Sequence, residues 1–292
     1  FMIGDFAAAP VAIMSRLSKE KKIICLFGST GSPTLSPDYP YVFRFSQSQA
    51  QKLDVLKVAM QTCPIKTIYL TYTDDQRGHD TMKEWKKVVV PLGLKIVGES
   101  YFHPRENNFA PVMTKVLAEK PDLIPAGSPG QAALMMKEAY ALGYRGYWVS
   151  SGSVVNLPEM IKIAGNKEAV ENWIGPYESL DCPIVKESDK PLLLEIQKRY
   201  LKKYSPPFEP LAWRYSCGMQ IFRDAIQKAG AADPDALKKV LEAETFETFF
   251  GSGKFTGQQT YGIAHQFAVT TIAVIIKNGE PKYLGYLKTQ EP

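Results

Sequence analysis

Apolar and polar residues recur along this chain with two different periods. Apolar positions spaced by three and four residues predict amphipathic helices, and short β-prone apolar runs predict strands. The predicted helices cover residues 8–19, 49–62, 81–90, 109–119 and 130–142. The predicted strands cover residues 23–27, 41–45, 66–72, 95–97, 122–125 and 147–150. Since single helices join successive strands, we expect parallel pairing with right-handed crossovers, and hence an α/β fold with a doubly wound sheet.

The pattern changes after residue 175. Three successive helices are predicted at 190–204, 211–230 and 234–244, and the chain then closes with the β-prone run FAVTTIAVIIKNGEPKYLGYL. Asn278 and Gly279 within that run predict a tight hairpin turn. The first residues, FMIGDFAAAPVA, are typical of a strand end that leads into a helix. We therefore expect the chain to leave one sheet, pack helices elsewhere and return.

Composition is that of an ordinary globular protein, with 45% hydrophobic and 22% charged residues among 292. The formal net charge of +5 rests on lysines scattered along the predicted helices, a pattern that argues against nucleic-acid binding. No apolar run is long enough to span a bilayer, and FAAAPVAIM lacks the charged leader of a signal peptide. The four cysteines show no CxxC spacing, which favours buried thiols and leaves the redox compartment open.

Motifs of catalytic chemistry are missing from the sequence. His79, His103 and His265 are far apart and show no HExxH spacing. The segment SSGS is not a GxSxG nucleophile elbow, and GSTGSP has the spacing of neither a phosphate loop nor a GxGxxG fingerprint. The lone histidine of FHPREN is typical of a solvated loop. We therefore expect a protein that is not an enzyme, with no catalytic residue, metal site or cofactor.

The segment IICLFGSTGSP places glycines and hydroxyl residues directly after a buried-looking strand. Small residues with free backbone N–H groups at the end of a strand suit the approach of a small polar molecule. An ordinary surface turn has the same composition. The residues alone leave both interpretations open.

Several segments, taken in order, resemble one family. They are FMIGDFAAAPVAIMSRLSKEKKIICLFGSTGSPTL, the run from KTIYLTYTDDQRG to EKPDLIPAG, GQAALMMKEAYALGYRGYWVSSGS, IAGNKEAVENWIG and LAWRYSCGMQIFRDAIQKAG. Their order is similar to that of type I periplasmic binding proteins, in the branch that binds leucine, isoleucine and valine. The resemblance covers nearly the whole chain, although no single motif is sharp.

The resemblance implies two α/β lobes, joined by three crossovers, that close on a small ligand. The first lobe would hold residues 1–46 and 177–260, and the second lobe residues 47–176 and 261–292. The ligand cleft would lie between them. The family has further βα units before the position of Phe1, so we expect the first lobe to be incomplete at its N-terminus.

The resemblance also implies site residues in the first lobe. The loop that holds the ligand's carboxylate in the family matches residues 28–33 here, with the candidates Ser29, Thr30, Gly31 and Ser32. Ala8 falls where amino-acid binders usually have a serine, so only a backbone contact would remain. Tyr177, Trp213 and Arg214 fall where the first lobe faces the cleft and would form an aromatic wall. Packing in the core or at the crossovers is the alternative for these three.

In the second lobe the chain departs from the family. A tyrosine that stacks over the ligand is replaced by Arg77, whose planar fork of donors suits an anion. An exposed arginine paired with Asp74 or Asp75 is the alternative. Ser128 matches a position that is often aromatic. The acidic partner of an amino acid's ammonium group should fall near Ser151, within VSSGS, where no carboxylate is present. Since burying an unpaired ammonium is costly, we expect a ligand other than a standard α-amino acid.

The function that the resemblance implies is that of a solute-binding receptor of an ABC importer, with a membrane permease as its partner. We expect its ligand to be a small carboxylate or aromatic acid rather than a branched-chain amino acid. A sensory domain of the same fold and an unrecognised α/β enzyme remain alternatives. The resemblance places the protein outside the cytoplasm, free in the periplasm or lipid-anchored at the outer face of a bacterial membrane.

Overall fold

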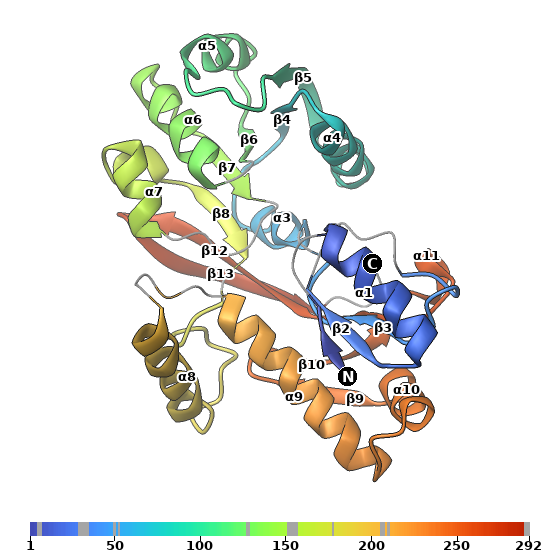
Figure 1. Ribbon diagram of the computed structural model, residues 1–292. Helices are drawn as coiled ribbons and strands as arrows, with labels where there is room; N and C mark the ends of the chain where they lie inside the picture. Colours follow the sequence, from blue (N-terminus) through green and yellow to red (C-terminus); the bar gives the residue numbers. More distant parts are fainter. Residues whose placement is uncertain are drawn as a thin grey trace. The chain divides into compact units, whose positions relative to one another are not determined.

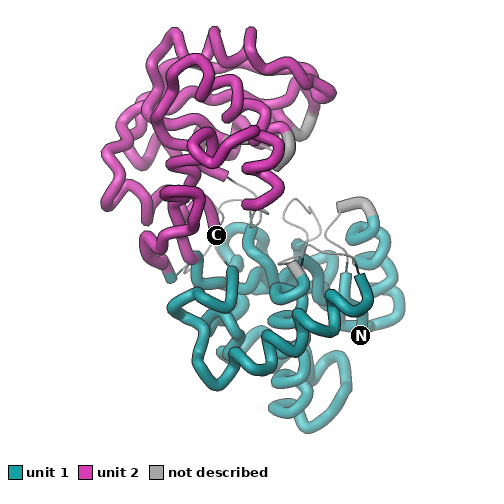
Figure 2. Tube along the Cα trace, turned by 90° about the vertical axis from the view of Figure 1, so that its left-hand side faces the viewer, with its two compact units in different colours: residues 1–51, 178–271, 288–292 teal, residues 52–177, 272–287 magenta. Residues whose placement is uncertain are grey.

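The computed structural model describes residues 1–4, 8–28, 35–48, 51, 53–126, 129–150, 157–176, 178–204, 208 and 211–288. The chain divides into two compact units (Figures 1 and 2). Unit 1 comprises residues 1–51, 178–271 and 288–292, and unit 2 comprises residues 52–177 and 272–287. The chain therefore passes from one unit to the other after residues 51, 177 and 271, and returns for its last residues after 287.

The lobe boundaries expected from the sequence lie after residues 46, 176 and 260, whereas the observed crossings lie after residues 51, 177 and 271. The third expected boundary differs most from the observed crossing. The strand β11 (Gln266–Phe267) pairs with β3 (Val42–Arg44) and with β10 (Gly251–Thr256), so residues beyond 260 still belong to the sheet of unit 1. Backbone pairing with these two strands holds the segment in unit 1 up to Thr271.

Unit 1 contains a six-stranded sheet in the order β1-β2-β3-β11-β10-β9. Besides β3, β10 and β11, this sheet contains β1 (Met2–Ile3), β2 (Cys25–Phe27) and β9 (Thr245–Thr248). The pairs β1–β2, β2–β3 and β3–β11 are parallel, whereas β10 is antiparallel to both β9 and β11. The antiparallel strands were not among those expected from the sequence; the hairpin formed by TFETFFGSGKFT has no helical crossover that could make its strands parallel.

Both faces of this sheet are covered by helices. The helices of unit 1 are α1 (Ala8–Lys21), α8 (Lys190–Lys203), α9 (Leu211–Ala229), α10 (Pro234–Ala243) and the short α11 (Gln258–Tyr261). Successive side chains of a strand point to opposite faces. Accordingly Leu26 and Phe43 pack with residues of α9 and α10, whereas Cys25, Phe27 and Val42 pack with Val11 of α1. This alternation makes the sheet doubly wound.

Unit 2 contains a seven-stranded sheet in the order β13-β12-β8-β7-β6-β4-β5. Its strands are β4 (Thr67–Thr73), β5 (Lys95–Phe102), β6 (Leu123–Ala126), β7 (Tyr147–Ser150), β8 (Trp173–Pro176), β12 (Thr270–Lys277) and β13 (Glu280–Lys288). The strands from β4 to β8 are parallel, and β12 runs antiparallel to β8. The sheet is thus mixed but predominantly parallel.

The two faces of the second sheet are also both buried. Its helices are α3 (Asp54–Ala59), α4 (Gln76–Val89), α5 (Ala110–Ala118), α6 (Pro129–Ala141), α7 (Leu157–Ala164) and the 3₁₀ turn η1 (Glu168–Val170). One core contains Ile124 and Trp148, and the other contains the neighbouring residues Leu123 and Val149. A strand that is buried on both faces has a continuous apolar run, and this explains the strongly apolar segments of the sequence.

The β-hairpin predicted near the C-terminus is confirmed. Asn278 and Gly279, between β12 and β13, both have positive φ, at 57° and 77°. Two consecutive left-handed residues form the tight turn that matches the twist of the strands it joins. Within the described part of the chain, no helix is both long and apolar enough to cross a membrane.

A buried histidine connects the sheet of unit 1 to α10. The Nδ1 atom of His265 lies 2.8 Å from the carbonyl oxygen of Val42, and its Nε2 lies 2.9 Å from a carboxylate oxygen of Glu242. Lys238, one turn earlier on α10, is 3.2 Å from the same carboxylate. The hydrogen bond with His265 and the charge of Lys238 lower the pKa of Glu242, and burial lowers the pKa of His265.

Acidification should therefore destabilise unit 1 through this pair. A carboxyl group whose pKa is lower in the folded state than its ordinary value of 4.5 stabilises the fold above that pH, and this stabilisation is lost as the pH falls. We expect Glu242→Gln to lower the free energy of unfolding by about 1 kcal/mol at pH 7 and by less at pH 4. Urea unfolding at both pH values measures this difference. Glu244→Gln, at the end of the same helix, is the control, and an equal loss at both pH values for Glu242→Gln would contradict the assignment.

Candidate functional site

Apart from Trp213, the residues expected to bind a ligand follow the carboxyl ends of parallel strands. In unit 2, β4, β6, β7 and β8 are parallel, so the segments that follow them begin at one edge of the sheet. In unit 1 the same holds for the segments that follow β1, β2 and β3. Ligands of doubly wound folds bind at this edge, because backbone N–H groups and loop side chains are available there.

The structure describes only part of the expected site. Ala8 is the first residue of α1, and Arg77 is the second residue of α4. Trp213 lies on α9. Seven expected residues lie outside the described residues: Ser29, Thr30, Gly31, Ser32, Ser128, Ser151 and Tyr177. Their proposed roles therefore rest on the sequence and on the strands that precede them.

Trp213 has the surroundings of a packed side chain. It is 4% exposed, and its indole Nε1 lies 3.4 Å from the carbonyl oxygen of Leu193 on α8. Its ring packs against Phe208, with 4.6 Å between centroids, and lies 6.4 Å from Phe250. These contacts favour the alternative considered from the sequence, in which Trp213 packs in the core.

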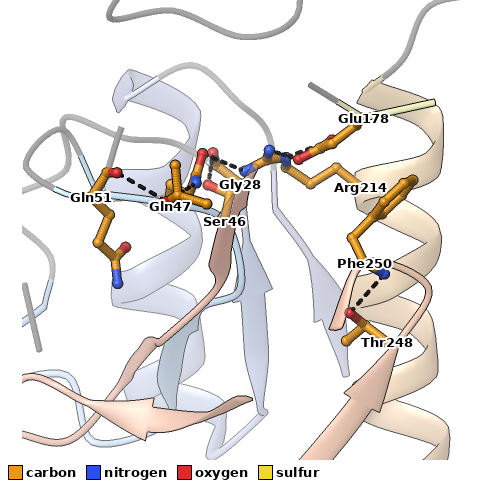
Figure 3. A network of polar contacts seen from close by, with 9 residues as sticks. Gly28, Ser46, Gln47, Gln51, Glu178, Arg214, Thr248 and Phe250 are labelled. Atoms are coloured by element: carbon orange, nitrogen blue, oxygen red, sulfur yellow. Dashed lines mark hydrogen bonds and ion pairs between the residues drawn. The ribbon is translucent and has the colours of Figure 1, made fainter. Parts of the chain in front are cut away.

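A buried polar segment follows β3. Ser46, Gln47 and Ser48 are at most 3% exposed, and so is Gln51. The Ser46 hydroxyl donates to the carbonyl oxygen of Gly28, at the end of β2, over 2.5 Å (Figure 3). Ser48 and Gln51 cap each other, since each backbone N–H donates to the other's side-chain oxygen, at 2.7 and 3.1 Å. These bonds hold the segment after β3 against the end of β2.

A buried ion pair lies beside this segment. Arg214, in the first turn of α9, binds both carboxylate oxygens of Glu178, through Nη2 and through Nε at 3.2 Å (Figure 3). Its remaining terminal nitrogen donates to Oε1 of Gln47 over 3.4 Å. Each of the two charged residues is only 8% exposed. A buried arginine needs acceptors for its donors, and Glu178 and Gln47 supply one to each of its three nitrogens here.

The charges of this pair compensate each other. Burial lowers the pKa of Arg214 to about 10, which leaves the guanidinium charged at neutral pH. Burial raises the pKa of the nearby Cys217 thiol to about 11, so this cysteine contributes no charge. The carboxylate of Glu178 is already occupied by Arg214. The buried pair therefore carries no net charge.

A second buried arginine supports the sheet from within. Arg44 on β3 is 2% exposed, and its Nε donates to the side-chain oxygen of Gln266. Its terminal nitrogen donates to the Tyr261 hydroxyl over 2.8 Å. The amide nitrogen of Gln266 in turn donates to the carbonyl oxygen of Ser46 over 2.8 Å. Burial lowers the pKa of Arg44. This network fixes the backbone at the carboxyl end of β3.

In unit 2, the turn from β4 into α4 lies at the edge of the sheet where the parallel strands have their carboxyl ends. Asp75 is the N-cap of α4, and its carboxylate accepts the backbone N–H of Gly78 over 2.7 Å. A Cβ atom at position 78 would lie 1.9 Å from the carbonyl oxygen of Thr73, so only glycine fits there. His79 lies 3.0 Å from Asp74. The turn places Arg77 in the first turn of a 14-residue helix, where the helix dipole favours anions.

Sequence reasoning missed the polar residues Gln47 and Gln51, which follow β3, and Glu178, which follows β8. Arg214 was expected near the cleft, but its partners were not. The run FSQSQAQ carried a usable signal, because polar residues that directly follow an apolar strand lie at its carboxyl end. The pairing of Glu178 with Arg214 had no such signal, since 36 positions separate them. Among the described residues, no group of three or more His, Cys, Asp or Glu side chains could hold a metal ion.

Two α/β units that are connected by repeated chain crossings and have mostly parallel sheets are the architecture of type I periplasmic binding proteins. The comparison with family models agrees. The model described as "Periplasmic binding protein" matches residues 1–280. The chain therefore belongs to the periplasmic binding protein family.

Individual relatives are distant in sequence. The leucine-, isoleucine-, valine-, threonine- and alanine-binding protein of Pseudomonas aeruginosa is 22% identical over 255 residues, and the match covers 86% of this chain and 66% of that protein. The chain thus spans just under two thirds of the length of this curated relative.

Solved structures share the fold. A branched-chain amino acid ABC transporter periplasmic ligand-binding protein from Burkholderia xenovorans matches with a TM-score of 0.78 at 14% identity, over 99% of this chain and 76% of that one. A solute-binding protein of an ABC transporter from Rhodopseudomonas palustris, in complex with p-hydroxybenzoic acid, matches with a TM-score of 0.74 at 18% identity, over 99% and 78% of the two chains.

The buried ion pair can be tested by removing its cation. We expect Arg214→Met to lower the free energy of unfolding by about 3–5 kcal/mol, because Glu178 is left buried and unpaired. The double variant Arg214→Met/Glu178→Gln should recover most of this loss. Urea or thermal unfolding measures both. Arg199→Met is the control, because the Arg199–Glu195 pair is exposed and should contribute at most about 1 kcal/mol. Equal losses for Arg199→Met and Arg214→Met would contradict the role of the buried pair.

Proposed function

We propose that the chain is the solute-binding receptor of an ABC importer and that it captures a small carboxylate or aromatic acid by closure of its two units. It would deliver this ligand to a membrane permease from the outer side of a bacterial membrane. The family membership supports the receptor role. The proposed ligand class rests on the positive charge of Arg77 and on the lack of an available carboxylate for an ammonium group.

The observation that carries the proposal is the position of Arg77. It is the second residue of α4, two positions after the N-cap Asp75, in the segment that follows the carboxyl end of β4. A cation at a helix N-terminus adds its charge to the partial positive charge of the free backbone N–H groups. An arginine at such a position suits a carboxylate, because its donors match the two oxygens of that group.

An amino acid would also need a partner for its ammonium group. The segment VSSGS, after β7, contains no acidic residue. In unit 1 the carboxylate of Glu178 is already bound by Arg214, so an ammonium group could recruit it only by breaking a buried ion pair. Both features favour an acid without an amine. The solved complex of a fold relative with p-hydroxybenzoic acid is compatible with a ligand of this kind.

Ligand binding should follow this charge pattern. We expect 4-hydroxybenzoate or benzoate to raise the thermal unfolding midpoint, and leucine and valine to leave it unchanged. A ligand at a hundred times its dissociation constant adds about 2.7 kcal/mol of stability, which a thermal-shift assay detects readily. Aliphatic dicarboxylates and the amides of the same acids complete the panel. A selective response to leucine or valine would overturn the proposed ligand class while leaving the receptor role intact.

Arg77 should determine affinity for an acid that binds. We expect Arg77→Ala to weaken the binding of 4-hydroxybenzoate, or of whichever acid in the panel binds, by at least tenfold, which corresponds to about 1.4 kcal/mol. Titration calorimetry measures the change. Lys83→Ala, an exposed cation on the same helix, is the matched control and should leave the affinity unchanged. Unchanged affinity of Arg77→Ala would place Arg77 outside the site.

A further inference from the structure

Before its last residues return to unit 1 after residue 287, the chain crosses between unit 1 and unit 2 at three places. The first crossing leaves unit 1 after Gln51, the second returns to it at Glu178, and the third leaves it after Thr271. The third crossing lies within a continuous strand, since β12 begins at Thr270 and continues to Lys277. All three crossing residues are at most 8% exposed. The positions of the three crossings therefore depend on buried contacts inside unit 1.

Side chains connect these three crossing ends to one another. Arg214 binds Glu178 of the second crossing and donates to Oε1 of Gln47. The amide nitrogen of Gln47 donates to the hydroxyl of Thr271, at the third crossing, over 2.8 Å. That hydroxyl donates in turn to the backbone carbonyl of Gln51, at the first crossing, over 3.2 Å. We call this set of five residues the crossing network; Figure 3 shows most of it.

The hydrogen bonds at the centre of the network each have a defined donor and acceptor. The carboxamide of Gln47 accepts from Arg214 through its oxygen and donates to Thr271 through its nitrogen. The single hydroxyl of Thr271 accepts one bond and donates the other. A chain of bonds with fixed donors and acceptors inside a buried region permits few alternative arrangements. The three ends are consequently held at fixed separations.

Within unit 2 the same three segments are also in contact. The helix α3, which follows the first crossing, packs against β8, which precedes the second. The strand β8 pairs with β12 of the third crossing, with Pro176 opposite Ala273. The crossings are thus tied to one another within each unit, by strand pairing and helix packing in unit 2 and by the crossing network in unit 1.

We infer that the crossing network is a positioning device that makes the three crossings act as one pivot, with Gln47 and Thr271 as its central link. Movement between two units is confined to a hinge only when the chain on either side of the hinge stays fixed. The network supplies that fixed side in unit 1. Without it, each crossing would adapt separately, and the two units would sample a wider range of separations. The inference concerns motion and does not depend on which ligand binds.

The link can be broken at a single hydroxyl. Thr271→Val keeps the shape of the side chain but removes both hydrogen bonds, whereas Thr271→Ser keeps the hydroxyl. Thr71→Val is the matched control, because the buried Thr71 also loses one side-chain bond, from Ser100, but lies within unit 2. Gln47→Met removes the same link from the other side and serves as a second variant should Thr271→Val fold poorly.

The measurement is the distribution of distances between the units in the full chain. Spin labels are attached at Lys254→Cys in unit 1 and Lys137→Cys in unit 2, two exposed positions, while the four native cysteines are buried. Double electron–electron resonance then gives the distance distribution without any ligand. We expect Thr271→Val and Gln47→Met to broaden the distribution relative to the unsubstituted protein, and Thr271→Ser and Thr71→Val to leave it unchanged.

The outcomes separate positioning from plain stability. If Thr271→Val and Thr71→Val both lower the unfolding midpoint but only Thr271→Val broadens the distribution, the network positions the crossings. If both variants lower the midpoint and neither changes the distribution, the network only stabilises unit 1 and the inference is overturned. Broadening in Thr271→Ser as well would also overturn it, because the hydroxyl would then not be the link.

Discussion

The buried charge of Arg214 is the constraint on which the organisation of unit 1 depends. A guanidinium inside a protein is tolerated only when each of its donors meets an acceptor, because an unpaired buried charge costs several kcal/mol. Glu178 and Gln47 supply an acceptor to each of its three nitrogens here. These partners come from segments that are distant in the sequence, so satisfying one side chain fixes where the segment after β3 and the segment after β8 lie against α9.

The two units share an architecture but differ in the polar groups at their strand ends. In unit 1 the described polar side chains largely satisfy one another, through Arg214 with Glu178 and through Ser48 with Gln51. In unit 2 the first turn of α4 presents a helix N-terminus that carries Arg77. An anion gains from such a helix end, whereas an ammonium group gains nothing there. The proposed preference for an acid over an amino acid follows from this difference in available charge.

Much of the fold could be predicted from the sequence, because the buried strands and the helices between them leave a strong periodic signal. The strand over Thr67–Thr73 and the turn at Asn278 and Gly279 were both expected. The antiparallel strands β9 and β10 were missed, since TFETFFGSGKFT is short and rich in glycine and shows no clear period. The candidate site was predictable only as a set of loops that follow strands. The position of a loop can be inferred from the strand before it, whereas the partners of a side chain cannot be inferred from the strand that carries it.

The sequence by itself determined the α/β class, the order of most elements, the strand ends that carry polar residues and the lack of an acidic residue in VSSGS. These properties are local, because periodicity, turn chemistry and composition act over a few residues. Only the tertiary structure decided that Glu178 faces Arg214 and that Gln47 reaches Thr271, 224 positions away. Such pairs depend on where the sheet brings distant segments together. Buried polar groups pair with whichever partner the geometry brings within reach, and no local pattern in the chain encodes that geometry.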